Sequence, residues 1–139
     1  MVRMRTVVAV LGIGSALAAC APVACPAIGY AAPSRVVLPA VPDVASVELR
    51  LCQSGTCSTA RATPAGGVAA PDLGSTRAER FEAGHGDVTV RLLTADGREA
   101  LGAGGSVPVY VSSFGSGPCT QHVAHVDVIV GADGTVSGR

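Results

Sequence analysis

Hydrophobic and polar residues alternate along several short stretches of the chain, a period of two that is typical of half-buried β-strands. The clearest stretch is residues 45–52, where valine and leucine at every second position share one face and polar residues share the other. After the loop over residues 53–56, residues 57–62 predict the return strand of a hairpin with a four-residue loop.

Three further stretches show the same alternation: residues 88–92, residues 107–111 and residues 122–130. Asp96 and Gly97 predict a tight turn before a strand over residues 98–101, and the glycines of residues 102–105 are interpreted as turn residues that separate it from the next strand. The residues that we expect in the core are Val47, Leu49, Leu51, Val88, Val90, Leu92, Val109, Val126 and Val128.

The segments between these stretches are predicted from their Pro, Gly and Ser content. Residues 36–38 predict a short edge strand among prolines, and Pro108 indicates an edge or a bulge. Residues 63–74 and 112–118 predict loops without a strand. Residues 75–84 predict a helical turn or an irregular strand, since Thr76 and Glu79 match a capping box and Gly84 would end a short helix.

Roughly seven short strands separated by Gly, Pro and Asp predict an all-β fold. We expect a small antiparallel β-sandwich of the immunoglobulin-like or transthyretin-like kind, as one domain over residues 43–139. It would follow a signal peptide and a tether.

The first residues of the chain have the organisation of an export signal. Arg3 and Arg5 precede an apolar run over residues 6–19, and the small residues Ala18 and Ala19 lead into Cys20. A helix over this run would be about 21 Å long, too short for the ~30 Å hydrocarbon core of a bilayer. A longer uncleaved anchor would be interrupted by prolines.

The sequence L-A-A-C that ends at Cys20 is similar to a bacterial lipobox, in which the cysteine thiol receives a diacylglyceryl group and becomes the mature N-terminus. Under this interpretation residues 1–19 are a lipoprotein signal peptide and residues 20–42 are the acylated N-terminus and tether. The alternative is free secretion after cleavage at Ala31, because Gly29 and Ala31 occupy the small-residue positions of such a site.

The chain resembles small, uncharacterised envelope lipoproteins of high-GC Gram-positive bacteria, which combine a lipobox, a CPA-type segment and one β-rich domain with a few more cysteines. The segments that carry this resemblance are C-P-A-I-G-Y from Cys25 to Tyr30, V-E-L-R-L-C from Val47 to Cys52, the lone Cys57, and G-P-C from Gly117 to Cys119. The resemblance implies no activity. It favours Cys20 as the lipid site over cleavage after Ala31.

Acylation of Cys20 would leave Cys25, Cys52, Cys57 and Cys119, an even number of thiols in an oxidising compartment. Cys52 and Cys57 flank the hairpin loop, so we favour the pairs Cys52–Cys57 and Cys25–Cys119. Cys52 has the opposite parity to Leu51 and so faces outward, which leaves a Cys52–Cys119 pair as an alternative.

Composition argues against several classes of function. Without Arg3 and Arg5, eight arginines stand against ten acidic residues, for a formal net charge of −2, so no basic surface indicates nucleic-acid binding. The chain has no tryptophan and four other aromatic residues, too few for a platform that stacks bases. The paired glycines lack the spacing of a phosphate-binding loop.

Candidate catalytic and metal-ligating residues are few. His122 and His125 would lie on opposite faces of a strand, although together with His85 and Asp87 they could in principle bind zinc. A catalytic triad would need a serine, and the candidates Ser112, Ser113 and Ser116 lie in no nucleophile-elbow motif.

We therefore expect a lipoprotein at the outer face of the cytoplasmic membrane that acts as a binding or structural module of the cell envelope. Its partners would be membrane lipid, through the acylated N-terminus, and an envelope protein, and the sequence indicates no enzyme activity, cofactor, metal or small-molecule substrate. The alternative is a small anchored or secreted metal- or redox-dependent enzyme that uses the histidines or a labile cysteine pair.

Overall fold

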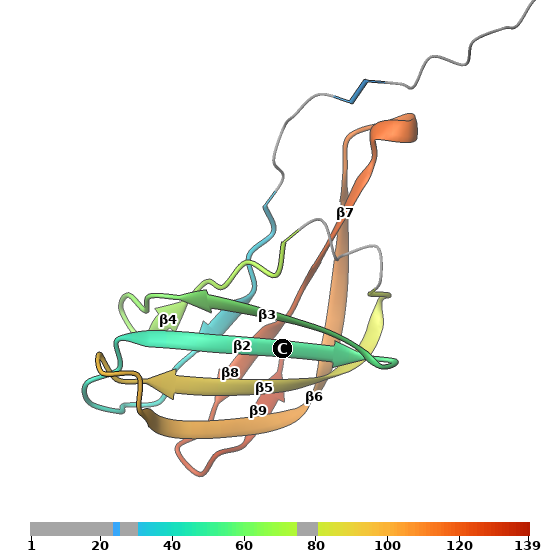
Figure 1. Cartoon of the computed structure of the whole chain (residues 1–139). Helices are drawn as coiled ribbons and strands as arrows, with labels where there is room; N and C mark the ends of the chain where they lie inside the picture. Colours follow the sequence, from blue (N-terminus) through green and yellow to red (C-terminus); the bar gives the residue numbers. More distant parts are fainter. Residues whose placement is uncertain (1–23, 26–30, 75–80) are drawn as a thin grey trace, which may run out of the picture.

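The computed structural model describes residues 24–25, 31–74 and 81–139, and these residues form two packed β-sheets (Figure 1). The predicted signal peptide, Cys20 and the predicted capping box at Thr76 and Glu79 lie outside the described residues. The described strands are β1 (Arg35–Val37), β2 (Ser46–Gln53), β3 (Thr56–Ala62), β4 (Val68–Ala69), β5 (Gly84–Leu93), β6 (Glu99–Phe114), β7 (Gln121–His125), β8 (Asp127–Val130) and β9 (Val136–Gly138), and the 3₁₀ turn η2 spans Gly117–Cys119.

The two sheets confirm the predicted small all-β sandwich. One sheet has five strands in the order β3-β2-β5-β6-β7, and all of its neighbouring strands are antiparallel. The other has four strands in the order β4-β1-β8-β9, where β1 and β8 are parallel and the other pairs antiparallel. The described residues thus form nine strands instead of the expected seven.

Residues that alternate along the strands fill the core between the sheets, and all nine predicted core residues are buried. Leu49 and Leu51 of β2 are fully buried, as are Val90 and Leu92 of β5. Further members of the core include Val36, Ala69, Phe81, Ala103, Val107, Ala124 and Val130. The core is therefore built mostly of aliphatic side chains, whose burial stabilises the fold by about 25 cal/mol per Å² of apolar surface.

β1 lies inside its sheet, so the prediction of an edge strand was wrong. It pairs with β4 on one side and runs parallel to β8 on the other. Ser34, which is buried, holds the start of β1 in place, because its Oγ accepts a hydrogen bond from the backbone N–H of Val126 at 3.1 Å. Val36 is completely buried, so the segment interpreted as a tether contributes to the core.

The β2–β3 hairpin has a tighter turn than predicted. Gln53 pairs with Thr56, which leaves only Ser54 and Gly55 in the loop. Their φ angles of 50° and 79° are both positive, as a two-residue turn of type I′ requires. The chain accepts this turn because glycine stands at the second position and Ser54 tolerates the first.

The glycines predicted to separate two strands lie inside β6, so that prediction was wrong. The strand continues from Glu99 to Phe114, including the first residues of the loop predicted over residues 112–118. A Cβ atom on Gly105 would lie 2.6 Å from the backbone oxygen of Val136. Glycine at this position therefore allows β9 to approach β6 closely, which is a different reason for glycine than a turn.

The strand predicted over residues 122–130 is in fact two strands in different sheets. β7 pairs with β6 in the five-stranded sheet, whereas β8 pairs with β1 and β9 in the four-stranded sheet. Val126, which is fully buried, lies at the crossing point. The alternation continues through this point because Ala124, Val126 and Val128 all face the core.

Two other segments also differ from the expectations. β4 lies within residues 63–74, which were predicted to contain no strand. Gly84 begins β5 instead of ending a helix. Pro108 lies in β6 opposite His85, where the ladder with β7 has not yet begun, so β6 is an edge there as predicted.

Candidate functional site

The end of β6 and the start of β7 leave the body of the sandwich as a two-stranded arm (Figure 1), whereas Val123 and Ala124 of β7 stay buried at its base. We use the name arm for residues 110–125, which comprise this end of β6, the turn η2 and β7. The ladder between β5 and β6 ends at Val109, and the ladder between β6 and β7 begins at Tyr110. Beyond Val109 the arm is therefore a hairpin whose tip is η2.

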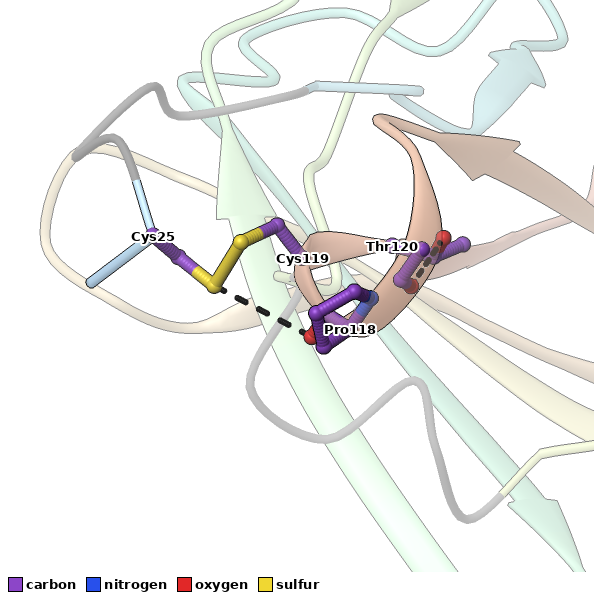
Figure 2. The surroundings of a disulfide bond; sticks show 5 residues. Cys25, Pro118, Cys119 and Thr120 are labelled. Atoms are coloured by element: carbon purple, nitrogen blue, oxygen red, sulfur yellow. Dashed lines mark hydrogen bonds between the residues drawn. A yellow bond between two sulfur atoms is a disulfide. The ribbon is translucent and has the colours of Figure 1, made fainter. Parts of the chain in front are cut away.

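A disulfide between Cys25 and Cys119 ties the N-terminal segment to the tip of the arm (Figure 2). The Cα atoms of the two cysteines are 5.3 Å apart, and 94 positions separate them in the sequence. The Sγ of Cys25 also lies 3.9 Å from the backbone oxygen of Pro118. The disulfide thus attaches the N-terminal segment, which connects the predicted anchor to the sandwich, to the arm tip.

Local sequence explains the shape of the tip. Pro118 occupies the first turn of η2, where its missing N–H costs no hydrogen bond. Thr120 closes the turn, since its Oγ1 donates a hydrogen bond to the backbone oxygen of Gly117 at 2.9 Å. Gly115 has a φ of 86°, and a Cβ atom there would lie 2.7 Å from the backbone oxygen of Cys119. These residues present Cys119 at the end of the arm.

Aromatic contacts and the C-terminus support the base of the arm. The rings of Tyr110 and His125 stack with centroids 5.7 Å apart. The Tyr110 hydroxyl donates a hydrogen bond to the backbone oxygen of Arg139 at 2.7 Å. The Tyr110 side chain nevertheless stays 42% exposed. The base of the arm therefore carries an exposed aromatic residue in a fixed position.

Ser113 and His122 face each other across the arm, and Ser113 Oγ lies 2.8 Å from His122 Nδ1. Both residues are exposed. Among the described residues no carboxylate is hydrogen-bonded to His122, so the pair lacks the third group that orients the histidine of a catalytic triad. Ser112 pairs with Val123, and Ser116 precedes η2, so the three serines do not converge on one site.

The three histidines occupy different places. His85 is exposed on β5 and pairs with Pro108, whereas His122 and His125 lie on β7. The described residues contain no group of three His, Cys, Asp or Glu side chains placed to hold a metal ion. The structure therefore brings none of these histidines into a metal centre within its described part.

The second disulfide joins Cys52 and Cys57, which are direct partners in the β2–β3 ladder with Cα atoms 4.1 Å apart. Both favoured disulfides are thus present, and the alternative between Cys52 and Cys119 is not formed. Next to this bridge, Gln53 donates hydrogen bonds to the backbone oxygens of Glu82 and His85 at 3.0 and 3.1 Å. The bridged hairpin therefore also fixes the start of β5.

Charged side chains gather on the outer face of the five-stranded sheet. Glu48 pairs with Arg61 at 2.6 Å and with Arg91 at 3.2 Å, and Arg91 pairs with Glu99 at 2.7 Å. The hydrogen bond from Arg61 is the main cause that lowers the pKa of Glu48, with a further contribution from Arg91. The hydrogen bond to Glu99 likewise raises the pKa of Arg91. Within this solvated network each carboxylate has a cation.

An apolar groove of about 640 Å³ lies beside the segment that joins β1 to β2. A second hollow of about 530 Å³ shares Asp43 and Val44 with it and reaches the turn between β5 and β6. The residues that line the first groove are Leu38, Pro39, Ala40, Val41, Pro42, Asp43, Val44, Pro64 and Gly67. β6 begins beside the second hollow and ends in the arm, so this hollow and the arm tip lie at opposite ends of β6.

The sequence did not predict the groove or the arm. The prolines in residues 38–44 could have indicated the groove, since they hold this segment extended. Asp43, with a φ of 61°, shapes the wall of the groove. The signal for the arm was the pairing of Cys25 with Cys119, which requires residue 119 to reach the N-terminal segment.

Comparison with protein-family models, with curated proteins and with solved structures finds no match to this chain. Within the described ranges, no helix has the length and apolar character needed to cross a membrane.

Proposed function

We propose that the chain is a lipoprotein anchored through Cys20 at the outer face of the cytoplasmic membrane, and that its β-sandwich is a binding or structural module of the cell envelope. The observation that carries the proposal is the disulfide between Cys25 and Cys119. It supports export, because disulfides persist in oxidising compartments outside the cytosol.

The use of the cysteines supports the assignment of Cys20. The chain has five cysteines, and the two disulfides use four of them. Cys20 is the fifth, and it stands at the end of the lipobox-like L-A-A-C. Cleavage after Ala31 would remove Cys25 and leave Cys119 without its partner, so the disulfide favours processing at Cys20 over free secretion.

The disulfide also gives the anchor a mechanical role. Five residues lead from Cys20 to Cys25, which allows a reach of about 18 Å at most, whereas the fourteen residues to buried Ser34 would allow about 50 Å. A domain held only at Ser34 could turn freely above the bilayer. The disulfide attaches the arm tip close to the anchor, so the chain between the anchor and the folded domain becomes shorter. This orients the sandwich with its arm toward the membrane.

This orientation turns the apolar groove beside residues 38–44 away from the membrane. The groove shares Asp43 and Val44 with the hollow at the start of β6, and the arm tip lies beyond the other end of this strand. A groove at that end faces other components of the envelope, which suits a module that binds an envelope protein or a similar ligand. The proposal assigns no catalytic step to the domain.

Membrane fractionation tests the proposal. The native chain should sediment with membranes and enter the detergent phase, whereas Cys20→Ala should be retained in the cytoplasmic fraction or released. Cys57→Ser with Cys52→Ser is the matched control, because it removes two other cysteines and their disulfide without touching the anchor. Equal membrane retention of Cys20→Ala and the native chain would contradict the proposal.

A further inference from the structure

We propose that the arm lies against the lipid surface itself, with its tip at the level of the headgroups. The inference rests on the proposed anchor at Cys20, since that anchor sets where the tether begins. It adds that the exposed residues of the arm are a membrane-contacting surface of the folded domain, and that the partner of this surface is a phospholipid bilayer.

The first argument is distance. The Cα atom of Cys119 is 5.3 Å from that of Cys25, which itself lies within about 18 Å of an anchor at Cys20. An acylated cysteine stays at the boundary between headgroups and hydrocarbon, where its chains enter the bilayer. The arm tip is therefore within about 23 Å of the membrane boundary however the rest of the domain turns.

The second argument is charge. No Asp, Glu, Lys or Arg occurs from Ala100 to Val126, a span that includes the entire arm. The outer face of the five-stranded sheet carries Glu48, Arg61 and Arg91, and the turn at the far end carries Asp96 and Arg98. Bringing formal charges toward hydrocarbon costs free energy, so an arm without these charges approaches a bilayer with little penalty.

The third argument is the kind of side chain on the arm. Tyr110 is 42% exposed at its base, and tyrosine is enriched where membrane meets water. The tip residues Gly115, Ser116, Gly117 and Pro118 are all exposed, small and uncharged. An exposed tip without large apolar side chains is suited to headgroups and interfacial water, and it offers nothing that hydrocarbon would favour. The arm therefore rests on the surface and does not insert deeply.

The chain contains no tryptophan, so a single introduced tryptophan reports its own surroundings. Ser116→Trp places the probe at the arm tip, and Ala95→Trp places the matched control in the exposed turn at the other end of β6. Each full-length acylated variant is incorporated into vesicles of phosphatidylcholine and phosphatidylglycerol, with or without bromine on the acyl chains near the headgroup. Fluorescence quenching by the brominated lipid is measured, and the intact mass of each preparation confirms acylation.

We expect quenching of the Ser116→Trp probe several-fold stronger than that of the Ala95→Trp probe, together with a blue-shifted emission. In a Ser116→Trp chain that also carries Cys25→Ser and Cys119→Ser, quenching should fall toward the control value. Equal quenching of the two probes in acylated, vesicle-bound protein would overturn this inference and leave the anchor intact. A preparation whose mass lacks the acyl chains would instead overturn the proposed function, and this inference with it.

Discussion

Cys25 and Cys119 form a disulfide that joins the N-terminal segment to the tip of the arm, whereas Cys52 and Cys57 form one that closes a hairpin. The two bridges differ mainly in the length of chain that they enclose, with sequence separations of 94 and 5. They therefore constrain the unfolded chain to very different extents.

Removing the long bridge should destabilise the domain more than removing the short one. In the chain-entropy model the long loop contributes about 4.7 kcal/mol and the short loop about 2 kcal/mol to the free energy of unfolding. Urea unfolding of Cys25→Ser with Cys119→Ser, compared with Cys52→Ser with Cys57→Ser, measures both losses. A larger loss for the hairpin pair would show that the Cys25–Cys119 bridge does not constrain the domain.

Gly105 and Gly104 are adjacent in β6 and offer a matched pair of substitutions. A Cβ atom on Gly105 would meet the backbone oxygen of Val136 at 2.6 Å, whereas one on Gly104 would have its nearest neighbour at 3.5 Å. Gly105→Ala should therefore displace β9 and cost about 1–3 kcal/mol of unfolding free energy, as overpacking does. Gly104→Ala should stay within about 0.5 kcal/mol of the native chain.

Thermal or urea unfolding of the two alanine variants decides this prediction. Equal stabilities would mean that β9 does not pack against β6 as described.

The pKa of Glu48 is lowered from 4.5, chiefly by the hydrogen bond from Arg61. A carboxyl group whose pKa is lower in the folded state stabilises the fold above its unfolded pKa, and this contribution disappears as pH falls through the folded pKa. Glu48→Gln should therefore be less stable than the native chain at neutral pH, and the difference should shrink below about pH 4.5. The effect should be small because Arg61 is largely exposed.

Urea midpoints measured from neutral to acidic pH test the prediction for Glu48. Glu82→Gln is the control, because the carboxylate of Glu82 forms no ion pair with the described residues. A stability difference for Glu48→Gln that grows as the solution is acidified would contradict the ion-pair account.

Local alternation was sufficient to predict the sandwich core. Leu49 and Leu51 are buried where period two places them, since a strand with one face on a core leaves little freedom in register. The pairing of Cys52 with Cys57 followed in the same way from the hairpin, because direct partners across a ladder are close enough for a bridge.

Long-range relationships could not be derived from such patterns. Gly105 was interpreted as a turn residue, but its role depends on Val136, which comes from a distant part of the chain. At Val126 the alternation continues while the chain passes from one sheet to the other, so the hydrophobic pattern does not show where the chain changes sheets. The position of β1 beside β8 is equally non-local.

The candidate site was predicted only through its cysteines. The preference for Cys25 with Cys119 identified the two segments that meet, but residues 112–118 before Cys119 were predicted to be a loop without a strand. Residues 112–114 instead continue β6 into the arm. Strand pairing with β7 outweighs their weak intrinsic preference for a strand.

The intact mass of the native chain, extracted from its own membrane without reduction and followed by peptide mapping, tests the central claim most directly. The account predicts a mature chain that begins at Cys20, carries a diacylglyceryl group on that residue, and yields one peptide pair linked through Cys25 and Cys119. An unmodified chain that begins at Ala32, with a free thiol at Cys119, would contradict it.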